Sequence, residues 1–373
     1  MEWETDILGD GFQAFRFQAA GLDGLKRTAT LVRHVPADSG GDPARPDPAL
    51  PDPPADPAWQ AWDRQQHDGQ QPSRRRVVLF LHGWSDYFFN VDLARFWADK
   101  GFEFFALDLH NHGRSLQPDT LGGYVADLGD YDAEIGHAIS IIAALEEKRP
   151  EPTTPEPTTP QQPSLTLMGH STGGLVAALW ASRHPGVVSH LVLNSPWLEM
   201  HRSPLVRRAA FTMVEPLARF RPETVLRLPE RGFYWRSISS SAEGEWVLDD
   251  RYRPPMAFPV RAGWLSAVLA GQSKVARGLR IEVPILVLLS GASANGMVWS
   301  EAMRRTDAVL DVNTLAVRAM SLGRTVTLER IDGALHDVFL SPPKVRADAY
   351  ARLSRWIRGY VAEAGEAAST APP

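Results

Sequence analysis

The pentapeptide Gly-His-Ser-Thr-Gly at residues 169–173 is a Gly-x-Ser-x-Gly pattern between two segments of different type. Residues 164–168 before it are apolar and β-favouring, and residues 175–181 after it are helix-forming. At a strand-to-helix corner, the glycines let the chain turn sharply enough to hold the serine hydroxyl clear of the backbone. The pattern therefore predicts a nucleophile elbow, with Ser171 as the attacking group.

A serine nucleophile needs a base that takes its proton and a carboxylate that orients this base. With this type of elbow, the chain order is serine, then acid, then histidine. The chain has 11 histidines, and only His336 lies late in it, directly after the last predicted strand. We therefore expect His336 to be the base.

The acid should lie between the elbow and His336. Asp307 follows the penultimate predicted strand and begins a run that ends at Asp311. We favour Asp307, and Asp311 stays open as an alternative. Glu199 also stays open, because the acid can follow the preceding strand.

Attack on a carbonyl group creates an oxyanion that needs preorganised N–H donors. Thr172, the residue after the nucleophile, is expected to supply one donor. The second should come from the loop that leaves the predicted strand 77–81, where the backbone N–H of Trp84 follows His82 and a glycine. We expect His82 to brace this loop rather than to act as a base or a metal ligand.

Asp108, His110 and His112 lie in one loop, a combination that could suggest a metal site. No further ligand cluster accompanies them, and a bend at Gly113 accounts for the pattern. The sequence also lacks a phosphate-binding loop and a dinucleotide fingerprint. We expect neither a metal nor another cofactor.

Strand-like and helix-like segments alternate from residue 75 onward. The predicted strands are 77–81, 102–107, 164–168, 187–194, 283–289 and 325–329, and the predicted helices are 90–100, 131–147, 175–181 and 343–364. This alternation predicts an α/β fold with a mostly parallel central sheet flanked by helices. Residues 11–18 and 28–35 are expected to form an antiparallel hairpin at one edge of the sheet.

The rhythm of the core breaks between residues 199 and 280, where we expect an inserted cap. The core should then comprise residues 1–198 and 281–373, with proline-rich excursions at 37–74 and 150–163. The cap carries large apolar side chains that favour an apolar acyl pocket, namely Phe233, Trp235, Phe258, Trp264 and Leu265.

Composition excludes several classes of function. At 373 residues and 44% hydrophobic content, the chain can build one large α/β domain with an insertion. Its net charge of -5 argues against nucleic-acid binding, and the absence of cysteine excludes disulfides and thiolate chemistry. The amino-terminal residues are acidic and no apolar stretch is long enough to span a bilayer, so we expect a cytoplasmic protein without a transmembrane segment. The sequence indicates no oligomeric state.

Together these motifs resemble α/β-hydrolases of the monoacylglycerol lipase and lysophospholipase-like group, often described as serine aminopeptidase-like. The resemblance covers residues 75–362 and rests on residues 81–83, 108–115, 169–173 and His336. It implies that Ser171 is the nucleophile, Asp307 the acid and His336 the base, with Trp84 and Thr172 supplying the oxyanion hole.

The chain departs from this group in two places. The group's acid commonly follows its strand within a few residues, whereas a longer interval that includes residues 291–296 precedes Asp307. Thr172 stands where many lipases of the group carry methionine.

The expected function is hydrolysis of a lipid-like or medium-chain carboxylic ester through an acyl-enzyme on Ser171, with a small-molecule ester as the partner. A peptidase or amidase of the same fold is one alternative. A non-catalytic ligand-binding protein with this fold is the other.

Overall fold

The computed structural model describes residues 2–36, 75–145, 163–200, 214–227, 231–294 and 296–361. The predicted excursion 37–74 lies outside the described residues, as does the predicted excursion 150–163 except for Pro163.

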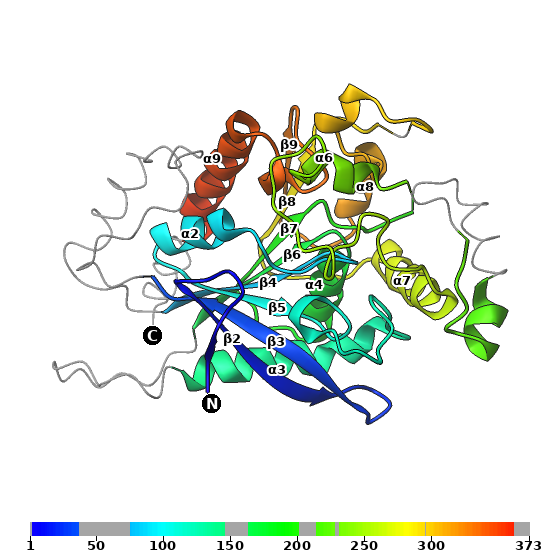
Figure 1. Cartoon of the computed structure of the whole chain (residues 1–373). Coiled ribbons are helices and arrows are strands. Elements are labelled where there is room, and N and C mark those ends of the chain that lie inside the picture. Colours follow the sequence, from blue (N-terminus) through cyan, green and yellow to red (C-terminus); the bar gives the residue numbers. More distant parts are fainter. Residues whose placement is uncertain are drawn as a thin grey trace.

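A nine-stranded sheet forms the centre of the molecule, in the order β1-β2-β3-β5-β4-β6-β7-β8-β9 (Figure 1). Its strands are β1 (Glu4–Thr5), β2 (Phe12–Ala20), β3 (Lys26–His34), β4 (Arg76–Leu81), β5 (Glu103–Asp108), β6 (Ser164–His170), β7 (His190–Asn194), β8 (Ile285–Ser290) and β9 (Val326–Ile331). The strands β5, β4, β6, β7, β8 and β9 pair in parallel, in that order across the sheet. The strands β1, β2 and β3 add an antiparallel edge next to β5. The predicted α/β fold with a mostly parallel sheet is confirmed.

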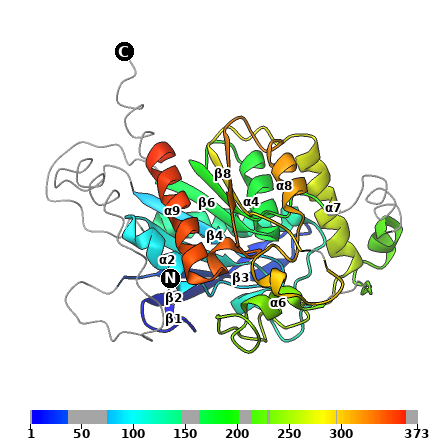
Figure 2. The ribbon, with the colours of Figure 1, turned by 90° about the horizontal axis from the view of Figure 1, so that it is seen from above.

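Helices cover both faces of this sheet, as the view from above shows (Figure 2). On one face lie α2 (Val91–Asp99) and α9 (Pro343–Tyr360). On the other lie α3 (Tyr131–Ala144), α4 (Thr172–Arg183), α7 (Ala262–Ala276) and α8 (Val312–Ala319). Each layer buries its apolar face against the sheet, so the chain has two apolar cores separated by the strands.

The strand β4 shows why the predicted strands are continuous apolar runs. Val77, Leu79 and Leu81 belong to one core cluster, whereas Val78 and Phe80 belong to the other. Successive side chains of a strand point to opposite faces, and here both faces are buried.

The predicted cap, residues 199–280, contains one helix that packs as part of the core. The helix α7 contacts α4, and Trp264, Leu265 and Val268 belong to the larger core cluster. Its other described helical parts are residues 214–220 and α6 (Phe233–Ile238). We therefore propose that the cap ends before Ala262.

Within the described ranges, no helix is both long and apolar enough to cross a membrane. The cytoplasmic location stays a prediction.

Candidate active site

Ser171 lies at the corner between β6 and α4 in a backbone conformation that few residues adopt. Its φ is 51° and its ψ is -117°. The Ser171 N–H donates a hydrogen bond to the carbonyl oxygen of Asn194 at 3.0 Å, and the Ser171 carbonyl oxygen accepts one from the Trp197 N–H at 2.9 Å. These contacts hold a strained turn that presents the side chain at the end of the strand.

Two glycines of the elbow are required by close backbone approach. A Cβ atom on Gly169 would lie 2.4 Å from the carbonyl oxygen of Gly173. A Cβ atom on Gly173 would lie 2.2 Å from the carbonyl oxygen of His82. The loop after β4 therefore packs directly against the start of α4, next to Ser171.

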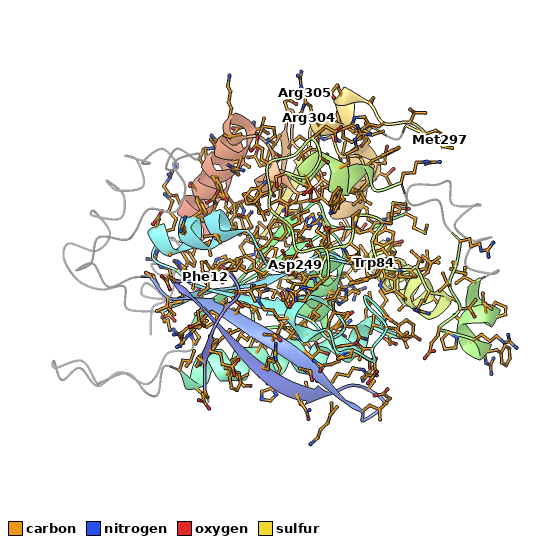
Figure 3. The ribbon with its side chains drawn as sticks, in the orientation of Figure 1. Phe12, Trp84, Asp249, Met297, Arg304 and Arg305 are labelled. Atoms are coloured by element: carbon orange, nitrogen blue, oxygen red, sulfur yellow. The ribbon has the colours of Figure 1, made fainter. Side chains whose placement is uncertain are left out.

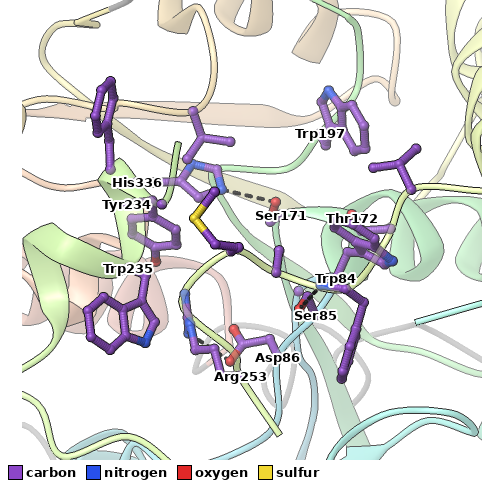
Figure 4. A pocket seen from close by; sticks show the side chains of 18 of the residues that line it. Trp84, Ser85, Asp86, Ser171, Thr172, Trp197, Tyr234, Trp235, Arg253 and His336 are labelled. Atoms are coloured by element: carbon purple, nitrogen blue, oxygen red, sulfur yellow. Dashed lines mark hydrogen bonds and ion pairs between the residues drawn. The ribbon is translucent and has the colours of Figure 1, made fainter. Parts of the chain in front are cut away.

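The side chains of Ser171, His336 and Asp307 form a chain of hydrogen bonds. Nε2 of His336 lies 2.9 Å from Oγ of Ser171 (Figure 4), and its Nδ1 lies 2.9 Å from Oδ2 of Asp307. His336 and Asp307 are buried, whereas Ser171 is partly exposed to the cavity in front of it. With the proton on Nδ1, Nε2 is an acceptor for the serine hydroxyl proton.

Asp307 reaches this position although many residues separate it from the end of β8. Ser293, three residues after β8, forms an isolated parallel bridge with Asp307. The Asp307 N–H donates to the carbonyl oxygen of Ala292 at 2.9 Å. The described residues between Ser293 and Asp307 form an excursion whose exposed side chains include Met297, Arg304 and Arg305 (Figure 3). This excursion accounts for the long interval in the sequence, and Asp307 lies beside the carboxyl end of β8.

The carboxylate of Asp307 is held by its own loop. Its Oδ1 accepts hydrogen bonds from the backbone N–H groups of Val309 and Leu310, each at 2.8 Å. These bonds leave Oδ2 directed at His336.

The two alternative acids are engaged elsewhere. Asp311 is the N-cap of α8, where its Oδ1 accepts from the Thr314 N–H at 2.6 Å. Glu199 forms an ion pair with Arg318 at 2.8 Å. The structure brings Asp307 to the imidazole and shows no hydrogen bond from His336 to Asp311 or Glu199.

Trp84 and Thr172, the two predicted oxyanion donors, both line the cavity at Ser171 (Figure 4). Thr172 is the first residue of α4, so its N–H has no partner within the helix. His82 braces the Trp84 loop: its Nδ1 lies 2.7 Å from the carbonyl oxygen of Gly83, and its Nε2 accepts from the Leu109 N–H at 3.1 Å.

Polar contacts of its own side chains hold the loop predicted to carry no metal. Asp108 forms an ion pair with buried Arg114 at 2.7 Å, and Nδ1 of His110 contacts a carboxylate oxygen of Glu134 on α3. Burial, with a further effect from His82, holds the pKa of His112 well below its ordinary value. The described part of the chain contains no cluster of three histidine or carboxylate side chains that could hold a metal ion.

The cavity in front of Ser171 has a volume of about 750 Å³ and is lined by both the core and the predicted cap. One wall is aromatic. The stacked rings of Trp84 and Trp264 have their centres 4.2 Å apart, and the ring centres of Trp197 and Trp264 are 5.8 Å apart. The volume is within the range of small-molecule sites.

Polar groups that the sequence analysis did not identify line another wall. Asp86, two residues after Trp84, pairs with Arg253 of the predicted cap at 2.7 Å. Tyr234 meets the ring of His336 edge to face at 5.1 Å. Asp86 could have been predicted as a site residue from its position in the predicted oxyanion loop. Arg253 could not, because no local motif marks it.

Three comparisons relate this chain to known proteins. A family model described as serine aminopeptidase, S33, matches residues 72–342. Lysophospholipase L2 of Escherichia coli strain K12 is 24% identical over 290 residues, which cover 74% of this chain and 78% of that protein.

Solved structures show the same fold. The monoacylglycerol lipase of Paleococcus ferrophilus aligns with a TM-score of 0.55 and 17% identity over 76% of this chain and 95% of that chain. A thermostable carboxyl esterase of Bacillus coagulans aligns with a TM-score of 0.57 and 14% identity over 94% of this chain and 99% of that chain.

Proposed function

The chain belongs to the serine aminopeptidase S33 family of α/β-hydrolases, and we propose that it hydrolyses carboxylic esters of lipid-like or medium-chain acyl groups. The observation that carries the proposal is the hydrogen-bonded chain from Ser171 through His336 to Asp307, at the wall of a largely apolar cavity. Related proteins named lysophospholipase and monoacylglycerol lipase support the substrate class.

In the first half of the reaction, Oγ of Ser171 attacks the ester carbonyl carbon and its proton moves to Nε2 of His336. The carbonyl oxygen becomes an oxyanion that accepts hydrogen bonds from the N–H groups of Trp84 and Thr172. Asp307 keeps the proton on Nδ1 and stabilises the imidazolium. The bond to the leaving alcohol then breaks, and the alcohol oxygen takes the proton from His336.

In the second half, a water molecule gives a proton to His336 and attacks the acyl carbon. The second tetrahedral intermediate uses the same N–H donors. When it collapses, the bond to Oγ breaks, Ser171 regains its proton from His336, and the carboxylic acid leaves.

The shape of the cavity favours an apolar acyl chain. His336 protonates the leaving alcohol and must therefore face it. The acyl chain then extends on the other side of Ser171. Trp84 and Trp197 lie on that side in Figure 4, and Trp264 stacks on Trp84. Burial of the acyl chain against these rings contributes about 0.8 kcal/mol per methylene group.

An aminopeptidase would need a carboxylate to bind the substrate's ammonium group. Asp86 is the one carboxylate among the described residues that line the cavity, and it pairs with Arg253. Esters therefore fit this site better than peptides with a free amino terminus.

A panel of p-nitrophenyl esters of increasing acyl length, measured beside matched anilides and aminoacyl substrates, tests the proposal. We expect ester turnover, with kcat/KM highest for medium-chain acyl groups. Ser171→Ala should lower kcat by at least about 10⁴-fold with an unchanged thermal unfolding temperature. Retained turnover in this variant, or faster cleavage of aminoacyl substrates than of esters, would contradict the proposal.

A folded wild-type chain that neither turns over esters nor reacts with a fluorophosphonate would instead favour the ligand-binding alternative.

A further inference from the structure

The core and the cap meet in a buried ion pair beside the reacting serine. Asp86 belongs to the loop after β4, Arg253 belongs to the cap, and Nη1 of Arg253 lies 2.7 Å from Oδ1 of Asp86. Both side chains are buried and both line the cavity. A second contact joins the same two segments, because the Phe258 N–H donates to Oγ of Ser85 at 2.9 Å.

The ring of Tyr234 lies between this ion pair and His336. Cζ of Arg253 is 4.9 Å from the centre of the Tyr234 ring, and the imidazole of His336 is 5.1 Å from it at an interplanar angle of 85°. Figure 4 shows the guanidinium, the phenol ring and the imidazole one after another along one side of the cavity. The Tyr234 ring therefore contacts both the guanidinium and the imidazole.

Other charged and titratable groups also face His336. Asp307 bonds to its Nδ1, and the ring of His170 from β6 lies 4.9 Å away. Burial lowers the pKa of His170 to about 4, so this histidine is neutral at pH 7. Asp337 lies 4.0 Å from His170 and bonds to the amide of Asn194.

Packing alone does not account for the charges of Asp86 and Arg253. Taking two charges out of water is costly, and an apolar pair of similar volume often stabilises a fold equally well or better. In a cavity of low dielectric constant, however, an unpaired charge strongly changes the proton affinity of a nearby group.

We propose that Asp86 and Arg253 act on the reaction as a balanced pair: each charge offsets the effect of the other on the proton affinity of His336, so that the loss of one charge alone disturbs the base. The cation opposes proton uptake by His336, and the anion favours it. This inference rests on the proposed function, in which His336 is the base.

The test is the dependence of kcat/KM on pH for a p-nitrophenyl ester, since loss of the neutral base produces the acid limb. Arg253→Gln removes the cation, so the midpoint of the acid limb should move to higher pH by about half a unit, a threefold change in the protonation equilibrium. Asp86→Asn leaves the cation unpaired, so the midpoint should move to lower pH by a similar amount. The double variant should return to within about 0.2 units of the wild type.

The size of the shift in Arg253→Gln depends on the protonation of Asp86. Burial raises the pKa of Asp86, against the effect of Arg253. If Asp86 takes up a proton once its partner is lost, this variant has lost both charges and its midpoint should match that of the double variant. Asp86→Asn is therefore the decisive single variant, because arginine keeps its charge.

Arg253→Lys keeps the charge and should keep the wild-type midpoint, even if looser packing raises KM. Glu243→Gln is the matched control, because it breaks an ion pair with Arg236 within the cap that does not line the cavity. Its midpoint should equal that of the wild type. Thermal unfolding identifies variants that fail to fold. If one of the single variants fails to fold, the remaining single variant, the double variant and the lysine variant still test the inference.

Rates of fluorophosphonate labelling against pH give a second readout that reports acylation alone. Shifts of the same sign in the two single variants, or no downward shift above about 0.2 units in folded Asp86→Asn, would overturn the inference while the proposed function stands. A folded wild type that neither hydrolyses esters nor reacts with the fluorophosphonate would instead overturn the proposed function.

Discussion

Replacing Asp307 by asparagine should disable the base without unfolding the protein. In the native chain, Oδ1 of Asp307 accepts two backbone N–H bonds of 2.8 Å, from Val309 and Leu310, and Oδ2 faces Nδ1 of His336 at 2.9 Å. An asparagine oxygen would keep the position of Oδ1, because a flipped amide would leave two buried N–H groups unpaired at about 1–3 kcal/mol each.

The NH₂ group of the introduced asparagine would then face Nδ1 of His336. Two donors cannot bond to each other, so the imidazole would carry its proton on Nε2 instead. That proton would face Oγ of Ser171, and Nε2 could no longer accept the serine proton. From the effect of the same change in a serine protease triad, we expect kcat to fall by about 10⁴-fold, or about 5 kcal/mol of transition-state stabilisation.

The assay is kcat on a medium-chain p-nitrophenyl ester, with thermal unfolding as the check on the fold. Asp311→Asn is the matched control, since asparagine caps a helix as well as aspartate does, and its kcat should stay within about threefold of the wild type. Glu199→Gln breaks the ion pair with Arg318 and should mainly lower stability. If Asp307→Asn keeps more than about a tenth of kcat while either control loses about 10³-fold, the assignment of the acid is wrong.

Three further predictions concern the elbow, the acyl wall and acid stability. Gly173→Ala would place a Cβ atom 2.2 Å from the carbonyl oxygen of His82, so we expect a loss of about 2 kcal/mol or more in the free energy of unfolding, and an unchanged unfolding temperature would refute it. Trp264→Ala removes the ring stacked on Trp84 and should raise KM for octanoyl esters more than for acetyl esters; equal changes would argue against an acyl pocket there. Burial lowers the pKa of His170 from 6.5 to about 4, so as the pH falls this histidine takes up a proton in the unfolded state before it does so in the folded state. The free energy of unfolding should therefore be full above pH 6.5 and decrease toward pH 4. His170 should account for up to about 3 kcal/mol of that decrease. Urea unfolding at both pH values measures that loss, and His170→Asn should reduce it.

The sequence predicted the elements of the core closely because their signals are local. Asn90 and Lys100 bounded the predicted helix, and they are the N-cap and C-cap residues of α2. The buried parallel strands were recognisable as apolar runs since both of their faces are covered. The helix α8, by contrast, was not predicted, and α7 was assigned to the cap although it packs in the core. Both lie beside insertions, where periodicity alone does not say which layer a helix joins.

Ser171, Thr172 and His336 could be predicted because local pattern and chain order identify them, while their catalytic roles stay predictions. Asp307 was harder, because the number of residues after β8 says nothing about the path of the chain. The bridge between Ser293 and Asp307 closes the excursion and returns the carboxylate to the strand end.

The sequence by itself determined the class of fold, the strained serine turn and the type of chemistry, because each depends on short-range steric and hydrophobic rules. Only the tertiary structure decided which carboxylate meets the imidazole and which groups surround it. Asp86 and Arg253 are 167 positions apart in the sequence. Their pairing depends on how the segment that carries Arg253 packs against the loop after β4, which is a balance of long-range contacts that no local pattern encodes.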